Sequence, residues 1–326
     1  MPSHFPASTQ IPDLILANPT AGGGVARDVL PRMQKFARQR SWHAEFRATQ
    51  DPLEFAQIAQ EEAAKGRERI FALGGDGTFQ VLLNALAGNF RVSLGILPAG
   101  SGNDLALALG LPPDPVQAAE AILLRGQTSC LDAVRVRTAD GVERLYMGGG
   151  GIGLDAEAAR FASGVYRKIR GRSRYLLSAI RALWGFQPVS ARVCFEGSAE
   201  ESLECKALLL GVLNTPSYGA GLRLAPDASL VDGKLDLVIL GDLSLLEIAN
   251  LLPRLALSGE IRTQKMQRHR LRKARIETER PCAFHGDGEI VGQTPVDVAA
   301  IPGAMRVWHA SAELAAAPSP NVVSPF

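Results

Sequence analysis

The chain has 326 residues, of which 46% are hydrophobic, 21% charged and 6% aromatic. This composition excludes a disordered chain, which needs more charge and fewer aliphatic side chains, and the length favours two domains over one. The 35 Lys and Arg residues nearly balance the 33 Asp and Glu residues, and the net charge of +2 excludes a surface that attracts nucleic acid over its whole extent.

The sequence offers neither a membrane span nor a secretion signal. No apolar run approaches the roughly 18 residues that a spanning helix needs, and the first ten residues lack a charged and then apolar leader. The four cysteines are scattered, with no CxxC pair and no His at zinc-like offsets, which indicates neither a disulfide framework nor a metal cluster. We therefore expect a cytoplasmic protein.

The first 130 residues alternate short apolar runs with amphipathic segments. The runs predict strands at 14–17, 44–48, 69–73 and 93–97, and the segments between them predict helices at 27–39, 52–64, 79–87 and 105–109. This βα alternation predicts an α/β domain at 11–132, with a parallel sheet covered by helices.

After Cys130 the pattern becomes β-rich. Short strands are expected at 133–138, 143–147, 191–196, 205–213, 235–240, 273–278, 295–298 and 305–309, and helices at 154–162, 175–184 and 245–257. Many short strands separated by turns predict a larger domain at 133–312, built as an antiparallel sandwich. The last residues, 313–326, are rich in Ala, Pro and Ser and are expected to form a disordered tail.

A glycine-rich loop lies between the third expected strand and its helix. It consists of Gly74, Gly75, Asp76, Gly77 and Thr78. Glycines let the backbone approach a bulky anion, and the free N–H groups of the following helix attract negative charge. The loop therefore predicts a phosphate site, with a plain tight turn as the alternative.

Three other expected strands end in similar loops. Gly100, Ser101 and Asp104 follow the fourth strand, while Asn18 and Thr49 follow the first two. The carboxyl ends of parallel strands meet at one edge of a sheet, where ligands of open α/β folds bind. Together these loops predict a nucleotide site.

These motifs resemble the diacylglycerol kinase catalytic domain family, which includes bacterial lipid kinases and the sphingosine and ceramide kinases. The resemblance rests on Asn18-Pro19, the loop 74–78 and the loop 100–104. It continues in the segment 214–236 and in Asp287-Gly288-Glu289, in the family's order, and it spans residues 14–309.

The resemblance implies an ATP-dependent lipid kinase that transfers a phosphoryl group to a hydroxyl, with ATP and Mg²⁺ as cofactors. It implies ATP-binding roles for the loop residues above, and carboxylates near the nucleotide metal at Asp76, Asp104 and Asp132. Glu289 is then the base that accepts the hydroxyl proton, with Asp287 beside it, because repulsion between two close carboxylates raises the pKa of one. Asp76 is an alternative base.

A second metal role follows from the resemblance alone. The family holds a structural Mg²⁺ in the loop before Asp236, which implies ligands at Asp232 and at the carbonyl oxygens of Ser229 and Lys234. An Asp-Gly turn without metal is the alternative.

The segment Gly148–Gly153 contains a GxGxxG pattern but lacks the acidic residue that a dinucleotide site needs about twenty positions later. Here the chain departs from the family, because Gly148 stands where the family usually has Asn, and Leu154 replaces an aromatic residue. Asp155 and Glu157 are expected to contact a substrate hydroxyl, although a capped helix start would also explain them.

Two basic clusters, at 167–174 and 262–275, could hold the protein on anionic headgroups, or could form a solvated face. We therefore expect a lipid substrate, peripheral contact with a membrane surface, and no nucleic-acid partner. The remaining alternatives are an NAD kinase-like phosphotransferase, which shares the GGDGT loop, and a catalytically idle nucleotide- or lipid-binding protein.

Overall fold

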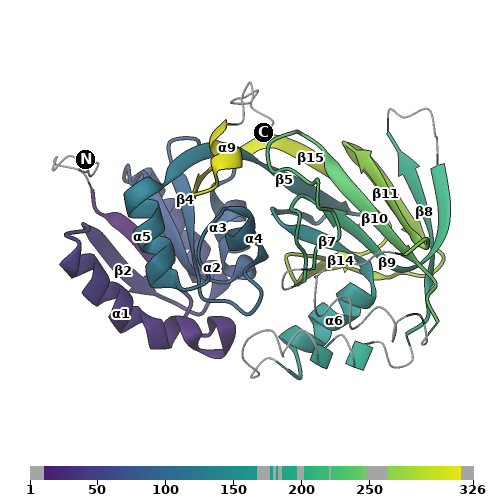
Figure 1. The fold of residues 1–326 in the computed structure, drawn as a ribbon, viewed down its shortest axis with the longest axis horizontal. Coiled ribbons are helices and arrows are strands. Elements are labelled where there is room, and N and C mark those ends of the chain that lie inside the picture. Colours follow the sequence, from purple (N-terminus) through teal and green to yellow (C-terminus); the bar gives the residue numbers. More distant parts are fainter. Residues whose placement is uncertain are drawn as a thin grey trace. The chain divides into compact units, whose positions relative to one another are not determined.

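The fold is that of a computed structural model, and its chain divides into two compact units. The structure describes residues 11–166, 177–178, 181–182, 186–196, 202–219, 222–244, 247 and 263–316. Among them, the first unit contains the residues up to Leu131 together with those from Gly303 onward, and the second contains Asp132–Pro302. Figure 1 shows the elements of both units.

A parallel sheet forms the centre of the first unit, as the sequence predicts. Its strands lie in the order β4, β3, β1, β2 and pair in parallel. Apolar runs buried on both faces explain why β1, β3 and β4 become strands, whereas β2 at the edge is only partly buried. The bounds are β1 (Asp13–Ala17), β2 (Ala44–Ala48), β3 (Arg69–Gly74) and β4 (Ser93–Pro98).

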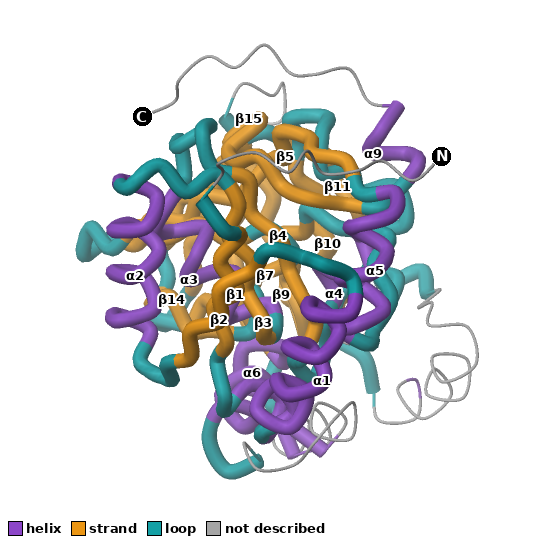
Figure 2. The backbone as a smooth tube through the Cα atoms, turned by 90° about the vertical axis from the view of Figure 1, so that its left-hand side faces the viewer, coloured by secondary structure: helices purple, strands orange, loops and turns teal. Residues whose placement is uncertain are grey.

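Helices cover both faces of this sheet. Figure 2 shows α2 and α3 on one side of β1–β3, and α1 and α5 on the other. The helices are α1 (Val25–Gln39), α2 (Pro52–Ala64), α3 (Asp76–Leu86), α4 (Asp104–Ala108) and α5 (Pro115–Arg125), with a short 3-10 turn at Ala21–Gly23. The sequence analysis missed α5, although the Asp114 carboxylate caps it by accepting the N–H groups of Val116 and Gln117.

The C-terminal segment differs from the expected domain bounds, and most of the expected tail, residues 317–326, lies outside the described residues. One long strand, β15 (Val296–His309), replaces the two predicted strands, and its end pairs in parallel with β4 through Arg306 and Val307. Residues after Pro302 therefore belong with the first unit, because β15 continues that unit's sheet. The short helix α9 (Ala312–Ala316) follows, where residues 313–316 were expected to be disordered.

The second unit is antiparallel and β-rich, as predicted. For example, β9 pairs antiparallel with β7, β8 and β10. Side chains from most of its strands, including Tyr146, Leu210 and Phe284, meet in one buried core. Its strands are β5 (Gln127–Thr138), which starts in the first unit, β6 (Glu143–Tyr146), β7 (Gly149–Gly153), β8 (Val189–Phe195), β9 (Ser202–Leu213), β10 (Leu235–Gly241), β11 (Met266–Leu271), β12 (Lys273–Thr278), β13 (Ala283–Gly286) and β14 (Glu289–Gln293).

Several of these strands differ from the predictions. The GxGxxG segment forms the buried strand β7, and part of the basic cluster at 262–275 forms β11. The helix α6 (Leu154–Ser163) lies where one was expected. The predicted helices at 175–184 and 245–257 lie largely outside the described residues, as does the basic cluster at 167–174. Among the helices that the structure describes, none has the length and apolar character to cross a membrane.

Candidate active site

The first glycine loop joins β3 directly to α3. Gly75 precedes the helix in an extended conformation, and the helix starts at Asp76. A side chain at Gly74 would clash with Thr78, because its Cβ would lie only 2.4 Å from the Thr78 Oγ1. The loop therefore needs glycine to turn tightly into the helix, and this turn leaves backbone N–H groups at the helix start for an anion.

The second glycine loop lies against the first. The Ala99 N–H donates to the Gly74 carbonyl over 2.7 Å, and a Cβ on Gly100 would lie 2.5 Å from the Gly75 Cα. Asn103 closes this loop in the left-handed region (φ 60°), where its Oδ1 accepts the Gly100 N–H. The two loops thus form one structure at the carboxyl ends of β3 and β4.

Asp76 binds the two loops together. Its carboxylate oxygens accept the backbone N–H groups of Asp104 and Leu105, each over 3.2 Å, at the start of α4. The resemblance implied a metal-side role for Asp76, and the structure gives the same carboxylate a positioning role.

The first-strand residue Asn18 also reaches the first glycine loop. Its Nδ2 donates to the Thr78 Oγ1 over 3.4 Å, and its Oδ1 accepts from Thr20. Thr49 differs, because its hydroxyl binds Glu54 and accepts the Asp51 N–H at the start of α2. The structure therefore brings Asn18 to the glycine loops, whereas the recorded contacts of the Thr49 hydroxyl are local.

Ser101 carries a signal for a ligand. Its Oγ is buried and finds no hydrogen-bond partner within the described part of the chain. A buried hydroxyl without a partner costs about 1–3 kcal/mol, which a bound acceptor would recover. In a loop of this kind, a phosphate oxygen is a suitable acceptor.

In the second unit, the predicted catalytic turn lies between β13 and β14. Asp287 adopts the left-handed region (φ 49°), and its carboxylate accepts the N–H groups of Met147, Gly148 and Gly149 over 3.0–3.1 Å. Burial raises the pKa of Asp287 to about 6, although these N–H groups oppose the shift. The raised pKa thus belongs to Asp287 and has burial as its main cause, rather than the repulsion by Glu289 that was expected.

The departure at Gly148 has a local explanation. A Cβ at this position would lie 2.7 Å from the Asp287 Oδ1. With its carboxylate at this distance from the backbone, Asp287 leaves no room for a side chain at position 148. Glu289 is exposed and begins β14, immediately after the turn.

The expected substrate contacts are already engaged within the protein. Asp155 is buried, and its Oδ2 accepts from the Tyr218 hydroxyl over 2.5 Å and lies 3.2 Å from the His285 Nε2. Its Oδ1 accepts the Ala156 N–H, but the alternative of a capped helix start is wrong, because the N-cap residue of α6 is Gly153 and no side chain caps the helix. Glu157 forms an ion pair with Arg160. The sequence analysis did not find Tyr218, for which the sequence carries no spacing signal.

The expected structural metal loop lies in the second unit, and its donors are largely satisfied by the protein. The Asp132 Oδ2 accepts the Gly233 N–H over 2.7 Å, and the Asp232 Oδ1 accepts the Lys234 N–H over 3.0 Å. The other Asp232 oxygen lies 3.8 Å from the Arg270 Nη1. The described residues contain no group of three or more His, Cys, Asp or Glu arranged to hold a metal. The Asp232 oxygen that no backbone N–H occupies faces the Arg270 guanidinium, and a carboxylate in that position does not fit a structural Mg²⁺.

Comparison with known proteins identifies the family. The diacylglycerol kinase catalytic domain matches residues 12–136, and the YegS C-terminal NAD kinase beta sandwich-like domain matches residues 150–309. A diacylglycerol kinase of Mycobacterium tuberculosis is 30% identical over 244 residues, which cover 75% of this chain and 77% of that protein. The chain belongs to the diacylglycerol kinase catalytic domain family.

Other members of the diacylglycerol kinase family match over more of the chain. A protein of Stenotrophomonas maltophilia named "Probable lipid kinase YegS-like" is 30% identical over 305 residues, which cover 90% of this chain and 94% of that protein. A crystal structure of a diacylglycerol kinase from Bacillus anthracis has the same fold, with a TM-score of 0.67 at 19% identity, over 94% of this chain and 99% of that one. The family and the fold are thus those expected, and family membership makes the chain a kinase.

Proposed function

We propose that the protein is an ATP-dependent lipid kinase, which transfers the γ-phosphate of ATP to a lipid hydroxyl of diacylglycerol or sphingoid type. The pair of closely packed glycine loops, with the unpartnered Ser101 hydroxyl in the second loop, is the observation that carries this proposal. Backbone N–H groups at the start of α3 would hold the phosphates, and Asp76, which accepts two N–H groups at the start of α4, would keep the loops together. Related proteins named diacylglycerol kinase and lipid kinase support the acceptor class.

ATP would bind together with Mg²⁺, which neutralises phosphate charge during phosphoryl transfer. Asp76 and Asp104 are the carboxylates of the first unit that fit this role, because they lie where the two loops meet. The chain's own contribution is to position the phosphates and to hold the acceptor's proton.

For that proton, the Asp287-Gly288-Glu289 turn supplies two candidates. A pKa of about 6 makes the Asp287 carboxylate a base that is mostly ionised at neutral pH yet able to take a proton. Glu289 is exposed and more accessible to a substrate. The rate of Glu289→Gln and of Asp287→Asn, followed against pH, separates them. If the replaced residue is the base, the variant no longer shows the fall in rate at acidic pH. If it is only the neighbour, the fall remains but occurs at a different pH.

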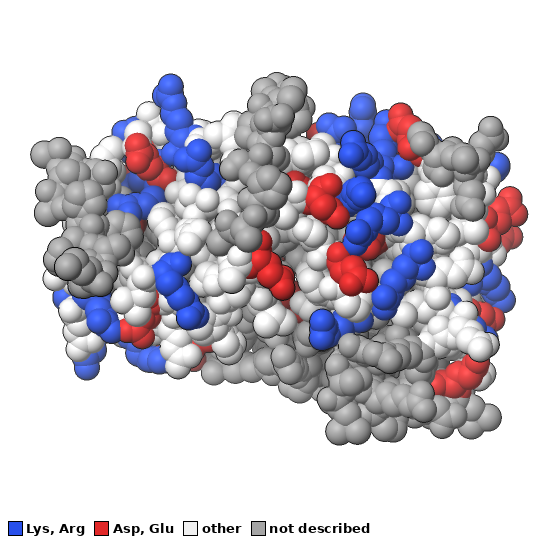
Figure 3. All heavy atoms as spheres, turned by 45° about the horizontal axis from the view of Figure 1, so that its top comes forward, with Lys and Arg blue, Asp and Glu red and all other residues white. Residues whose placement is uncertain are grey.

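Membrane-surface action is part of the proposal because the acceptor hydroxyl of such a lipid lies at a bilayer surface. The basic cluster at 262–275 supports it only weakly. Among its described members, Lys265, Lys273 and Arg275 form ion pairs with carboxylates, and Figure 3 shows cationic and acidic side chains interspersed on one face. We expect salt-dependent binding to vesicles that contain anionic lipid. If the protein does not bind these vesicles, it acts on lipid dispersed in detergent and not on lipid in a bilayer.

Transfer of radiolabelled phosphate from ATP tests the function directly. The purified chain is incubated with Mg²⁺ and, separately, with diacylglycerol, ceramide, sphingosine, phosphatidylglycerol and NAD. A labelled lipid supports the proposal and names the substrate. A labelled NAD would instead establish an NAD kinase, and ATP binding without any labelled product would establish an idle binding protein.

A further inference from the structure

Arg270 lies across the loop in which the family's structural metal was expected. It stands on β11 directly opposite Asp236 of the neighbouring antiparallel strand β10. Its Nε lies 3.5 Å from the Asp236 Oδ1, and its Nη1 lies 3.8 Å from the Asp232 Oδ2. Its Nη2 donates to the Asp227 carbonyl over 2.6 Å. One guanidinium therefore contacts the start, the middle and the end of the segment 227–236.

The electrostatics of this loop agree with the contacts. The Arg270 guanidinium lies near the carboxylates of both Asp232 and Asp236. Without a cation beside them, these two carboxylates would repel each other.

We propose that the Arg270 guanidinium takes the place of a divalent cation in this protein, so that the loop keeps its native structure without bound metal. An arginine can contact several oxygens from one planar group, as a metal does, and it stays charged at all accessible pH values. A divalent ion bound to the open Asp232 oxygen would lie beside this guanidinium and be repelled by it. The inference goes beyond the proposed function and does not depend on it.

Thermal unfolding of the full-length protein without nucleotide tests the proposal. We expect the same Tm in EDTA as in millimolar Mg²⁺ or Ca²⁺. A structural site filled a hundredfold above its Kd would instead raise the Tm by roughly 5 °C or more. Isothermal titration with Mg²⁺ should likewise show no saturable heat assignable to this loop.

A variant and a matched control locate the effect. Arg270→Met should lower the Tm in EDTA and should regain part of the loss on addition of Mg²⁺, because the carboxylates of Asp232 and Asp236 are then left without their cation. Arg268→Met makes the same change two residues away, at an exposed position for which the described residues provide no ion pair. It should change neither the Tm nor its response to metal.

Two results would overturn the proposal. One is a wild-type Tm that falls in EDTA and recovers with Mg²⁺, which would establish a metal site beside Arg270. The other is an Arg270→Met variant as stable in EDTA as Arg268→Met. If Arg270→Met does not fold, Arg270→Lys keeps the charge, and a folded lysine variant with a metal-dependent Tm would also contradict the proposal.

Discussion

Gly75 and Gly100 approach so closely that neither tolerates a side chain. The Cα of each lies under 3 Å from where a Cβ would stand on the other, and both contacts are with backbone, which cannot rotate away. The juxtaposition of the two phosphate loops therefore depends on the absence of two methyl groups.

We predict that Gly100→Ala separates the loops, with a loss of about 1–3 kcal/mol in stability and a larger loss of ATP affinity. Chemical denaturation and nucleotide titration measure the two effects. Gly211→Ala is the matched control, because its added Cβ would meet its nearest atoms at 3.5 Å or more, an ordinary contact distance. Equal ATP affinity in both variants would remove the loop contact from nucleotide binding.

Asp287 should make stability depend on pH. Its folded-state pKa of about 6 lies above the ordinary 3.8, so between these values the folded protein binds more protons than the unfolded chain. The free energy of unfolding should therefore fall as the pH rises from about 4 to about 6, by at most about 1.4 kcal/mol per pH unit from this group. Asp287→Asn should lack this component in denaturation curves measured at several pH values. A variant with the wild-type slope would place the titration elsewhere.

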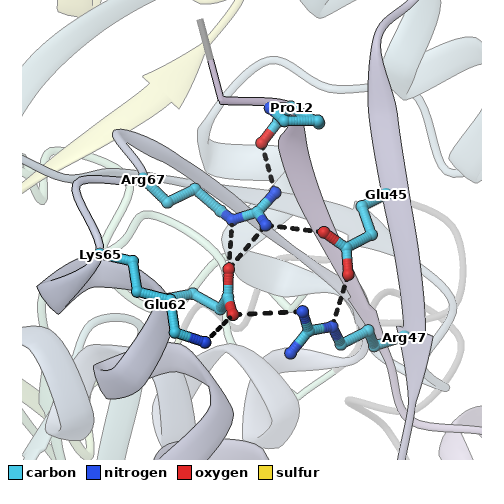
Figure 4. Close-up of polar contacts among 6 residues, drawn as sticks. All are labelled: Pro12, Glu45, Arg47, Glu62, Lys65 and Arg67. Carbon is cyan, nitrogen blue, oxygen red and sulfur yellow. Dashed lines mark hydrogen bonds and ion pairs between the residues drawn. The ribbon is translucent and has the colours of Figure 1, made fainter.

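At the scale of elements, β2 is an edge strand. Besides its backbone pairing with β1, ion pairs join it to the residues that follow it in the chain. Figure 4 shows Glu62 and Arg67, both buried, joined to Glu45 and Arg47 of β2 and to Lys65. The Arg67 guanidinium also donates to the Pro12 carbonyl. The network fixes the end of α2 and the loop into β3 against β2.

The pair of Glu62 and Arg67 should matter more than surface ion pairs do. We predict that Glu62→Gln lowers the free energy of unfolding by about 3 kcal/mol, because a buried guanidinium loses its main partner. Glu61→Gln, the same change at an exposed neighbouring position, should have little effect. Similar losses in the two variants, measured by urea denaturation, would show that the network adds no stability.

The pair of Glu62 and Arg67 should make the free energy of unfolding rise with pH, whereas Asp287 should make it fall. Burial alone would raise the pKa of Glu62, but hydrogen bonds from Lys65 and Arg67 outweigh burial and lower it to about 2 from the ordinary 4.5. The stabilisation is therefore present above pH 4.5 and is lost as the pH falls towards 2.

The sequence predicted these elements unevenly, for physical reasons. The strands β1, β3 and β4 were clear because buried parallel strands are continuous apolar runs. The strand β11 was hidden because only one of its six residues is buried and three are exposed, and its arginines looked like a surface cluster. The strand β7 was hidden because four of its five residues are glycines, which have no side chains to form an apolar pattern.

The candidate site shows the same limit. Local loops such as 74–78 could be read from spacing, since their geometry is set by adjacent residues. The contacts of Asp76 with Leu105, and of Arg270 with Asp227, join residues far apart in the chain, and no local pattern encodes them.

At the scale of the whole molecule, the first unit is built from two separate stretches of the chain. The first unit takes its last strand from residues after Pro302, where Met305 and Val307 are fully buried. The Trp308 ring stacks on Phe71, and its Nε1 donates to the Ser93 Oγ over 3.0 Å.

We predict that a chain ending at Pro302 loses the cooperative unfolding of its nucleotide-binding unit and aggregates, because β4 becomes an uncovered edge. Limited proteolysis should then cleave within residues 11–131. Removal of residues 317–326 alone is the control and should leave the protease resistance unchanged. A resistant first unit in the chain ending at Pro302 would show that the returning strand is dispensable.

The pairing of β4 with β15 also governs when the protein can fold. Ser93 meets Arg306, so the first unit includes a contact between positions separated by nearly two thirds of the chain. During synthesis, an N-terminal domain usually folds as soon as it leaves the ribosome. Here that domain must wait, with the edge of β4 unpaired, until all of the second unit has been translated. The time for which the first unit needs protection by chaperones should therefore depend on when residues 303–309 are synthesised, and not on when its first strands are.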